Sequence, residues 1–231
     1  MNKLVVWGHH VDEYMEMFDL SATDLQGKIL EYGCGPSAVN AELDGQAALR
    51  ISCDPLFNLD MATLNSKAAL IFADMIDKVT REQDKFDFSG YGSLERFIEK
   101  RRDGVNTFFA DYLSGKKAKR YQGIHEIALP FADFTFDLAL SSHYLFAELY
   151  DQDIQFHIRA IKELARVARE VRIFPLIDRY GQPSSFLGPV LLDLQQSNYG
   201  AEVRSVAYHL QPEGNAMLRV WAQECPVGTG A

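Results

Sequence analysis

The stretch between residues 28 and 54 is the part of the sequence that most limits the fold. The strand Lys28–Tyr32 is followed at once by the turn Gly33-Cys34-Gly35-Pro36-Ser37, a short helical stretch and a second strand over residues 48–53. Two strands joined by a helix in so few residues pair in parallel, because the helix carries the chain back along one face of the sheet. The sequence therefore predicts a parallel sheet that is covered by helices.

The remaining chain extends this pattern with one interruption. Residues 56–119 are expected to be wholly helical, which is too long for a simple crossover between strands. Further strands are expected at 120–125, 136–141, 171–176, 201–210 and 216–223, and helices at 61–79, 94–102, 105–113, 154–168 and 186–196. A Pro/Gly turn joins the last two strands, so they should pair antiparallel. The predicted fold is α/β and doubly wound, with a mostly parallel seven-stranded sheet that ends in an antiparallel hairpin.

Composition and charge narrow the class of protein. Aromatic residues make up 12% of the 231 residues, which supplies ample apolar surface for a core. The net charge of −9 disfavours nucleic-acid binding by the whole surface. Cys34, Cys53 and Cys225 are odd in number and lack a C-x-x-C spacing, so neither disulfides nor a metal site is expected. No apolar run suits a secretory signal or a membrane span, so we expect a cytoplasmic protein.

We expect one domain over residues 1–231, with two additions to the sheet. Residues 1–25 form an N-terminal helical segment in which Tyr14, Met17 and Phe18 pack into the core. His9 and His10 are expected to be exposed; the alternative is that the segment folds over the site and brings them to it. Residues 56–119 form an insertion between the second and third strands. We expect this insertion to be a helical cap at the ligand-binding edge of the sheet.

The glycine turn has the spacing of a nucleotide-binding loop. Gly33-x-Gly35-x-x-Ala38 matches the pattern G-x-G-x-x-G/A, and Asp54 follows at the end of the next strand. Glycines let a ligand approach the backbone, the helix start offers free N–H groups, and a carboxylate binds ribose hydroxyls. A tight turn without a ligand is the alternative, and the combined pattern favours a nucleoside site.

Two features argue against NAD as that nucleoside. Glu31 places a negative charge where a pyrophosphate would lie, and an antiparallel finish is unusual for a dinucleotide domain. Residues 29–37 and 128–142, the latter containing Leu129-Pro130-Phe131 and Phe136-Asp137, resemble the class I S-adenosylmethionine-dependent methyltransferases. Residues 161–167 are similar to the helix that follows in that family. The resemblance covers about residues 26–47 and 121–223 and implies a Rossmann-like methyltransferase fold.

The resemblance also implies a set of cofactor-binding residues. Glu31 would face the methionine end of S-adenosylmethionine, Asp54 would bind the ribose, and residues 125–127 would border the adenine. The implied set is Glu31, Tyr32, Gly33, Gly35, Asp54, Leu56, His125, Glu126 and Ser141. The family usually has an acid where His125 stands, so Glu126 is a possible substitute.

His143 is the candidate general base, because it directly follows the strand that would line the methyl-donor pocket. The alternative is a structural histidine that caps the next helix or packs on the sheet. A basic run that includes Arg101, Arg102 and residues 116–120 could hold an anionic acceptor or a partner, although solvated helix ends explain such runs more often.

The sequence thus predicts a transferase that moves a methyl group from S-adenosylmethionine to a small-molecule acceptor, leaving S-adenosylhomocysteine. Two alternatives stay open: an NAD-dependent oxidoreductase and a non-catalytic, S-adenosylmethionine-binding regulatory protein. The sequence does not identify the acceptor, and a homodimer stays open as well.

Overall fold

A seven-stranded mixed sheet forms the centre of the protein. The computed structural model describes residues 6–46, 48–125, 127–147 and 152–222. The strands are β1 (Lys28–Tyr32), β2 (Leu49–Asp54), β3 (Tyr121–Gly123), β4 (Phe136–Ser142), β5 (Ala168–Phe174), β6 (Tyr199–Ser205) and β7 (Ala216–Ala222). Their order is β3-β2-β1-β4-β5-β7-β6, with every pair from β3 to β5 parallel and β7 antiparallel to both neighbours. The predicted fold class and the terminal hairpin are therefore confirmed.

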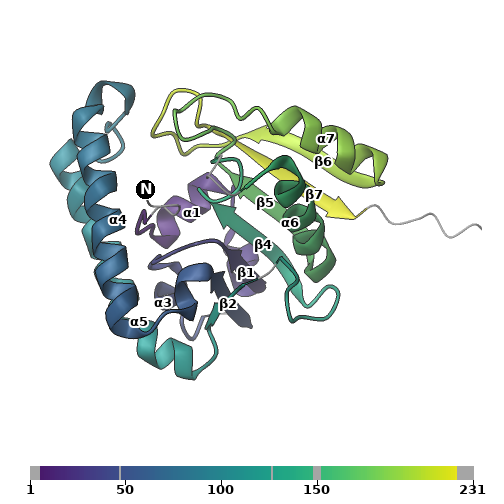
Figure 1. Cartoon of the computed structure of the whole chain (residues 1–231), viewed down its shortest axis with the longest axis horizontal. Coiled ribbons are helices and arrows are strands. Elements are labelled where there is room, and N and C mark those ends of the chain that lie inside the picture. Colours follow the sequence, from purple (N-terminus) through teal and green to yellow (C-terminus); the bar gives the residue numbers. More distant parts are fainter. Residues whose placement is uncertain (1–5, 47, 126, 148–151, 223–231) are drawn as a thin grey trace, which may run out of the picture.

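Helices cover both faces of this sheet. The α-helices are α1 (Val11–Met17), α2 (Ala22–Gln26), α3 (Val39–Glu42), α4 (Met61–Arg81), α5 (Leu94–Lys117), α6 (Ile154–Val167) and α7 (Leu187–Gln196), and short 3₁₀ helices are η1 (Pro55–Asn58) and η2 (Gln83–Lys85). Figure 1 shows α6 and α7 on one side of the sheet, with α1, α3 and the long helices α4 and α5 on the other. The long helices belong to the predicted insertion.

Side-chain alternation divides the core between the two faces. Along β1, Leu30 packs in the cluster that contains α6, whereas Ile29 packs with α1 and α3. Along β4, Ala139 and Leu138 divide in the same way. Successive side chains of a strand point to opposite faces, so a strand that is buried on both sides is apolar throughout. This explains why β4 contains a single charged residue, Asp137.

Helix α5 differs from the prediction of two short helices separated by Gly104. It is continuous from Leu94 to Lys117, and Gly104 lies inside it. A Cβ at Gly104 would lie 2.0 Å from the carbonyl oxygen of Gly8, and one at Gly8 would lie 2.4 Å from the carbonyl oxygen of Arg101. The glycine therefore does not end the helix; its lack of a side chain lets the N-terminal segment lie directly on α5.

Helix α3 ends at Glu42, and Gly45 in the turn that follows has a left-handed conformation, with φ +75°. One other element is shorter than expected. Strand β6 ends at Ser205, and Tyr208 and Leu210 beyond it pack into the cluster with α1. In the described part of the chain, no helix is both long enough and apolar enough to span a membrane.

Candidate active site at the ends of the parallel strands

The glycine turn after β1 adopts a conformation that depends on glycine. Gly33 and Gly35 have φ values of +69° and +57°, in the left-handed region that other residues rarely adopt. The Gly33 N–H donates to the Cys53 carbonyl at 2.8 Å, which ties the turn to the end of β2. The turn therefore lies at the carboxyl edge of the sheet, beside the point where the strand order reverses between β1 and β4.

Asp54 supports this turn from the end of β2. Its Oδ2 accepts from the Gly35 N–H at 2.7 Å, and its Oδ1 accepts from the Leu56 N–H at 2.8 Å. Burial raises the pKa of Asp54 to about 6, although both backbone N–H groups favour the charged form. The predicted proximity of Asp54 to the glycine turn is present, and its carboxylate holds the turn in place.

Glu31 lies beneath the turn in a buried polar environment. Its Oε2 accepts a short hydrogen bond from the Ser52 hydroxyl, whereas Oε1 has no partner among the described residues. Burial raises the pKa of Glu31 to about 6, although the hydrogen bond from Ser52 favours the charged form. Glu31 and the guanidinium of Arg50 line a closed cavity of about 10 Å³, a volume near that needed for one water molecule.

An open pocket of about 520 Å³ lies next to the turn. Its lining residues are Tyr32, Pro55, Asn58, Leu59, Ile124, His125, Ile127, Tyr144 and Phe156. They come from the carboxyl ends of β1 to β4 or from the segments that follow, which is where ligands of open α/β sheets bind. The volume lies within the range of about 300–1,000 Å³ that is usual for small-molecule sites.

Tyr144 separates this pocket from the glycine turn. A Cβ at Gly33 would lie 2.2 Å from Cγ of the Tyr144 ring, so the ring rests directly on the glycine. The same ring meets Tyr32 edge to face, with 5.6 Å between the ring centroids. In this structure the open face of Gly33 is thus covered by a side chain from the segment after β4.

The structure brings some of the predicted cofactor residues together and not others. Tyr32 and His125 line the open pocket, and Gly33 adjoins it through Tyr144. Leu56 is 1% exposed and packs in the apolar cluster of the helical insertion, away from the pocket lining. Ser141 is fully buried, and its hydroxyl has no partner among the described residues. Glu126 lies outside the described residues.

His143 contacts the N-terminal segment, which corrects the expectation that His9 is exposed. His9 is 3% exposed, and its Nε2 lies 3.2 Å from His143 Nδ1. The two rings stack with centroids 4.8 Å apart, and Trp7 lies 4.9 Å from His143. The close contact between Gly8 and Gly104 brings His9 to this position, so it does not lie in a solvated tail. His10 is also buried, with Nδ1 against the Glu42 carboxylate.

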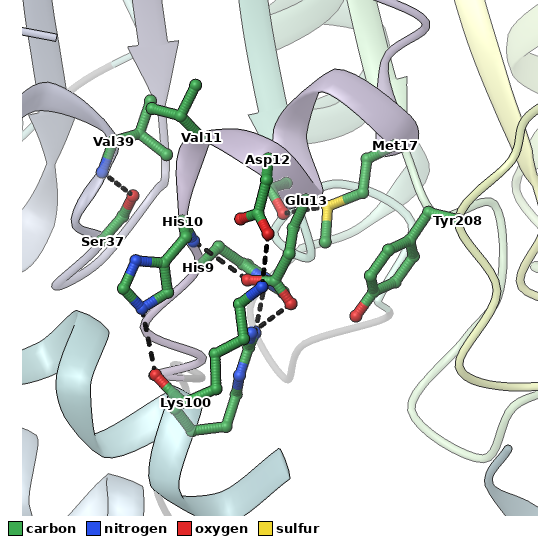
Figure 2. A network of polar contacts seen from close by, with 12 residues as sticks. His9, His10, Val11, Asp12, Glu13, Met17, Ser37, Val39, Lys100 and Tyr208 are labelled. Atoms are coloured by element: carbon green, nitrogen blue, oxygen red, sulfur yellow. Dashed lines mark hydrogen bonds and ion pairs between the residues drawn. The ribbon is translucent and has the colours of Figure 1, made fainter. Parts of the chain in front are cut away.

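Arg101 is buried with a partner, contrary to its expected place in a solvated basic run. Its guanidinium forms a fully buried ion pair with Glu13 and donates to His9 Nδ1 at 2.7 Å. Burial by itself raises the pKa of Glu13, but the Arg101 guanidinium outweighs it and holds that pKa far below its usual range. Figure 2 shows Glu13, His9 and His10 directed from the start of α1 toward the helix that carries Lys100.

Sequence reasoning missed several residues of this region, and one of them had a signal. Phe97, Arg101, Gly104, Phe108 and Tyr112 recur every three or four residues along α5 and are all buried. An arginine within such an apolar stripe predicts a buried ion pair. The acidic partner came from α1, and no sequence pattern links these distant segments. Asn58, Tyr144 and Phe156 in the pocket lining had no comparable signal.

Comparisons with known proteins give one close relative. No family model matches the chain. The chain is 30% identical over 218 residues to uncharacterized protein MJ0045 of Methanocaldococcus jannaschii, an alignment that spans 93% of this chain and 94% of the relative. The chain belongs to the family of this archaeal protein. The relative's description states no activity, so the membership fixes the family and leaves the function to the site itself.

The similarity to solved structures is lower. An N-methyltransferase NodS from Bradyrhizobium japonicum is 14% identical and matches with a TM-score of 0.49 over 93% of this chain and 96% of that one. An S-adenosylmethionine-dependent methyltransferase from Aquifex aeolicus is 14% identical and matches with a TM-score of 0.40 over 91% and 92% of the two chains. Similarity at this level carries no argument about activity.

Proposed function

We propose that this protein is a methyltransferase that binds S-adenosylmethionine and methylates a small-molecule acceptor. The observation that carries the proposal is the open, aromatic-walled pocket beside a left-handed glycine turn, at the carboxyl edge of a sheet with this strand order. The fold alone does not define a reaction, so the proposal depends on this site.

The pocket suits the nucleoside end of such a cofactor. Tyr32 and Phe156 offer aromatic surface to a purine, and Asn58 and His125 add polar groups at the rim. Asn58 Nδ2 donates to the Ile124 carbonyl at 2.7 Å, which joins η1 to the segment after β3. These contacts support a preformed pocket for the adenosine moiety.

The acids near the turn suit the other end of the cofactor. Glu31 and Asp54 are the buried carboxyls closest to the turn, and a sulfonium or an ammonium group is attracted to negative charge. When bound, the cofactor supplies an electrophilic methyl group on sulfur. The chain's residues have to hold that methyl in line with the acceptor's lone pair, which is a task of positioning.

The ring of Tyr144 covers the glycine turn and would obstruct a cofactor that binds there. The ring occupies the space over Gly33 that the amino-acid end of the cofactor would need. In the methyltransferase proposal, Tyr144 has to turn away when the cofactor binds. Tyr144→Ala should then strengthen binding severalfold, because the ring no longer has to be displaced. Equal binding by Tyr144→Ala and the wild type would show that the ring does not compete with the cofactor.

Titration calorimetry with S-adenosylmethionine, S-adenosylhomocysteine and NAD tests the proposal. We expect saturable micromolar binding of the first two and none of NAD. His125→Ala should weaken binding about fivefold, equivalent to about 1 kcal/mol, because the residue is exposed at the pocket rim. His209→Ala is the matched control, since His209 is exposed and pairs with Asp87 outside the pocket lining. Binding of NAD alone would overturn the proposal.

A further inference from the structure

A chain of hydrogen bonds runs from α5 to the end of β4, next to the proposed site. Arg101 Nη1 lies 2.7 Å from His9 Nδ1, and His9 Nε2 lies 3.2 Å from His143 Nδ1. The hydroxyl of Ser142 lies 2.8 Å from the same His143 nitrogen. Arg101, His9 and Ser142 are 0%, 3% and 6% exposed, so water does not compete for these contacts.

The chemistry of arginine sets the direction of this chain. A guanidinium has only donors, so His9 Nδ1 has to accept from Arg101 and carries no proton. Burial lowers the pKa of His9 to about 4, so the ring is neutral at physiological pH and its single proton lies on Nε2. That N–H points at His143 Nδ1, which therefore accepts. His143 consequently carries its own proton on Nε2.

The donor at the start of the chain is firmly held. Arg101 is paired with Glu13, whose carboxylate also accepts from the Tyr91 hydroxyl and the His10 backbone N–H. The helix position of Arg101 is fixed against the N-terminal segment by the contact between Gly8 and Gly104. Rotation of the guanidinium away from His9 would leave a buried charge with fewer partners, which is costly.

We propose that Arg101 and His9 hold His143 as a hydrogen-bond donor to the acceptor substrate and thereby prevent it from acting as a general base. His143 Nε2 makes no hydrogen bond to any described residue, and the side chain, although packed against Trp7 and His9, is not completely buried. His143 directly follows β4, which pairs with β1, and the next residue, Tyr144, covers Gly33, so His143 lies at the same edge of the sheet as the glycine turn. This inference rests on the proposed methyltransferase function.

The inference specifies the class of acceptor. An N–H donor complements an oxygen that accepts, as in a carboxylate or another oxyanion. A lone pair of the oxyanion forms the new bond to the methyl carbon while the carbon–sulfur bond breaks and its electron pair stays on sulfur. No proton is released, so this reaction needs no base. Arg101 and His9 act through His143 and are positioning residues.

Nitrogen-15 NMR of the histidine rings tests the proton positions without any activity. We expect His9 and His143 to be neutral in the wild type, each with its proton on Nε2.

Variants test the cause of this arrangement. His143→Gln identifies the His143 signals. His9→Gln should preserve the tautomer of His143, because an amide both accepts from Arg101 and donates onward. His9→Phe combined with Ser142→Ala removes both donors to Nδ1 and should give a mixture of tautomers. A proton on His143 Nδ1 in the wild type would overturn the inference, as would an unchanged tautomer in the double variant.

A small carboxylate tests the acceptor class. With S-adenosylhomocysteine bound, titration with acetate should shift the His143 Nε2–H resonance saturably, and methylammonium should not. No response to acetate, or an equal response to both ions, would contradict an oxyanion acceptor.

Calorimetry with S-adenosylmethionine on the same samples separates the two proposals. Cofactor binding with the wrong tautomer refutes only this inference, whereas the expected tautomer without cofactor binding refutes the methyltransferase proposal and this inference with it.

Discussion

At the scale of single residues, Arg101 contributes both to the stability of the fold and to the hydrogen-bond chain that ends at His143. Its guanidinium is fully buried, and it meets Glu13, His9 and the faces of the Tyr91 and Phe97 rings. Two charges out of water add little net stability as a pair, but one charge left alone is strongly destabilising. The ion pair therefore makes the contact between α1 and α5 specific.

Arg101→Met should lower the free energy of unfolding by roughly 3–5 kcal/mol, because it leaves the buried Glu13 carboxylate without its partner. Urea unfolding followed by circular dichroism measures this loss. Arg102→Met is the matched control, since Arg102 is exposed on the same helix, and we expect a change within about 0.5 kcal/mol.

The double variant Arg101→Met/Glu13→Leu tests the cause of that loss. Removal of both charges should recover a large part of it, because no unpaired charge remains. A double variant that is as unstable as the sum of the two single variants would show that packing, not charge, dominates at this contact.

Single residues also show where sequence-based prediction succeeds and fails. The proximity of Asp54 to the glycine turn followed from local spacing, because one strand–helix–strand unit sets both positions. The partners of Arg101 and His143 come from segments about 90 and 134 residues away. No periodicity encodes such pairs, so the sequence identified His143 as a candidate without its neighbour His9.

At the scale of elements, the N-terminal segment and α5 meet through two glycines. A Cβ at Gly104 would lie 2.0 Å from the Gly8 carbonyl oxygen, a distance that requires backbone movement. Both segments carry residues of the hydrogen-bond chain, so their separation also sets the distance between Arg101 and His9. The prediction of a helix break at Gly104 was wrong because glycine serves close packing here, and this use leaves no local signal.

Gly104→Ala should destabilise the protein by about 1–3 kcal/mol, although alanine is the better helix former, because the methyl group overpacks this contact. Thermal or urea unfolding measures the effect. Gly188→Ala is the control: Gly188 is exposed in α7 with open space around its Cα, and alanine there should be neutral or stabilising by up to about 1 kcal/mol. A stabilised Gly104→Ala protein would contradict the close approach.

At the scale of the whole molecule, the sheet was predictable because the residues of each strand reflect whether its faces are buried. β1, β4 and β5 each place apolar residues in the core, and the Pro/Gly turn before β7 marks the antiparallel hairpin. The order of the strands was not a local property. That order was not predicted from the sequence, and neither was the arrangement of α4 and α5 against α3.

The same sheet buries two carboxyl groups, and this affects the stability of the whole molecule as pH changes. The pKa of Glu31 is raised by burial to about 6, above the usual value of 4.5. The folded protein therefore binds this proton more tightly than the unfolded chain does. Stability from this group is full below the unfolded pKa and falls as pH rises through 6, where the buried group has to ionise.

Glu31→Gln isolates this effect, because the amide stays neutral at every pH and its oxygen still accepts from Ser52. The free energy of unfolding of Glu31→Gln, minus that of the wild type, should rise by about 2 kcal/mol between pH 4 and pH 8, which corresponds to the shift from 4.5 to about 6. Urea unfolding at pH 4, 5, 6, 7 and 8 measures the difference. Glu16→Gln is the control, since Glu16 is exposed on α1 and water solvates its charge in both states. If the difference in unfolding free energy from the wild type does not change with pH for either variant, Glu31 ionises in the folded protein without a penalty. The cavity that Glu31 shares with Arg50 would then solvate the charge sufficiently.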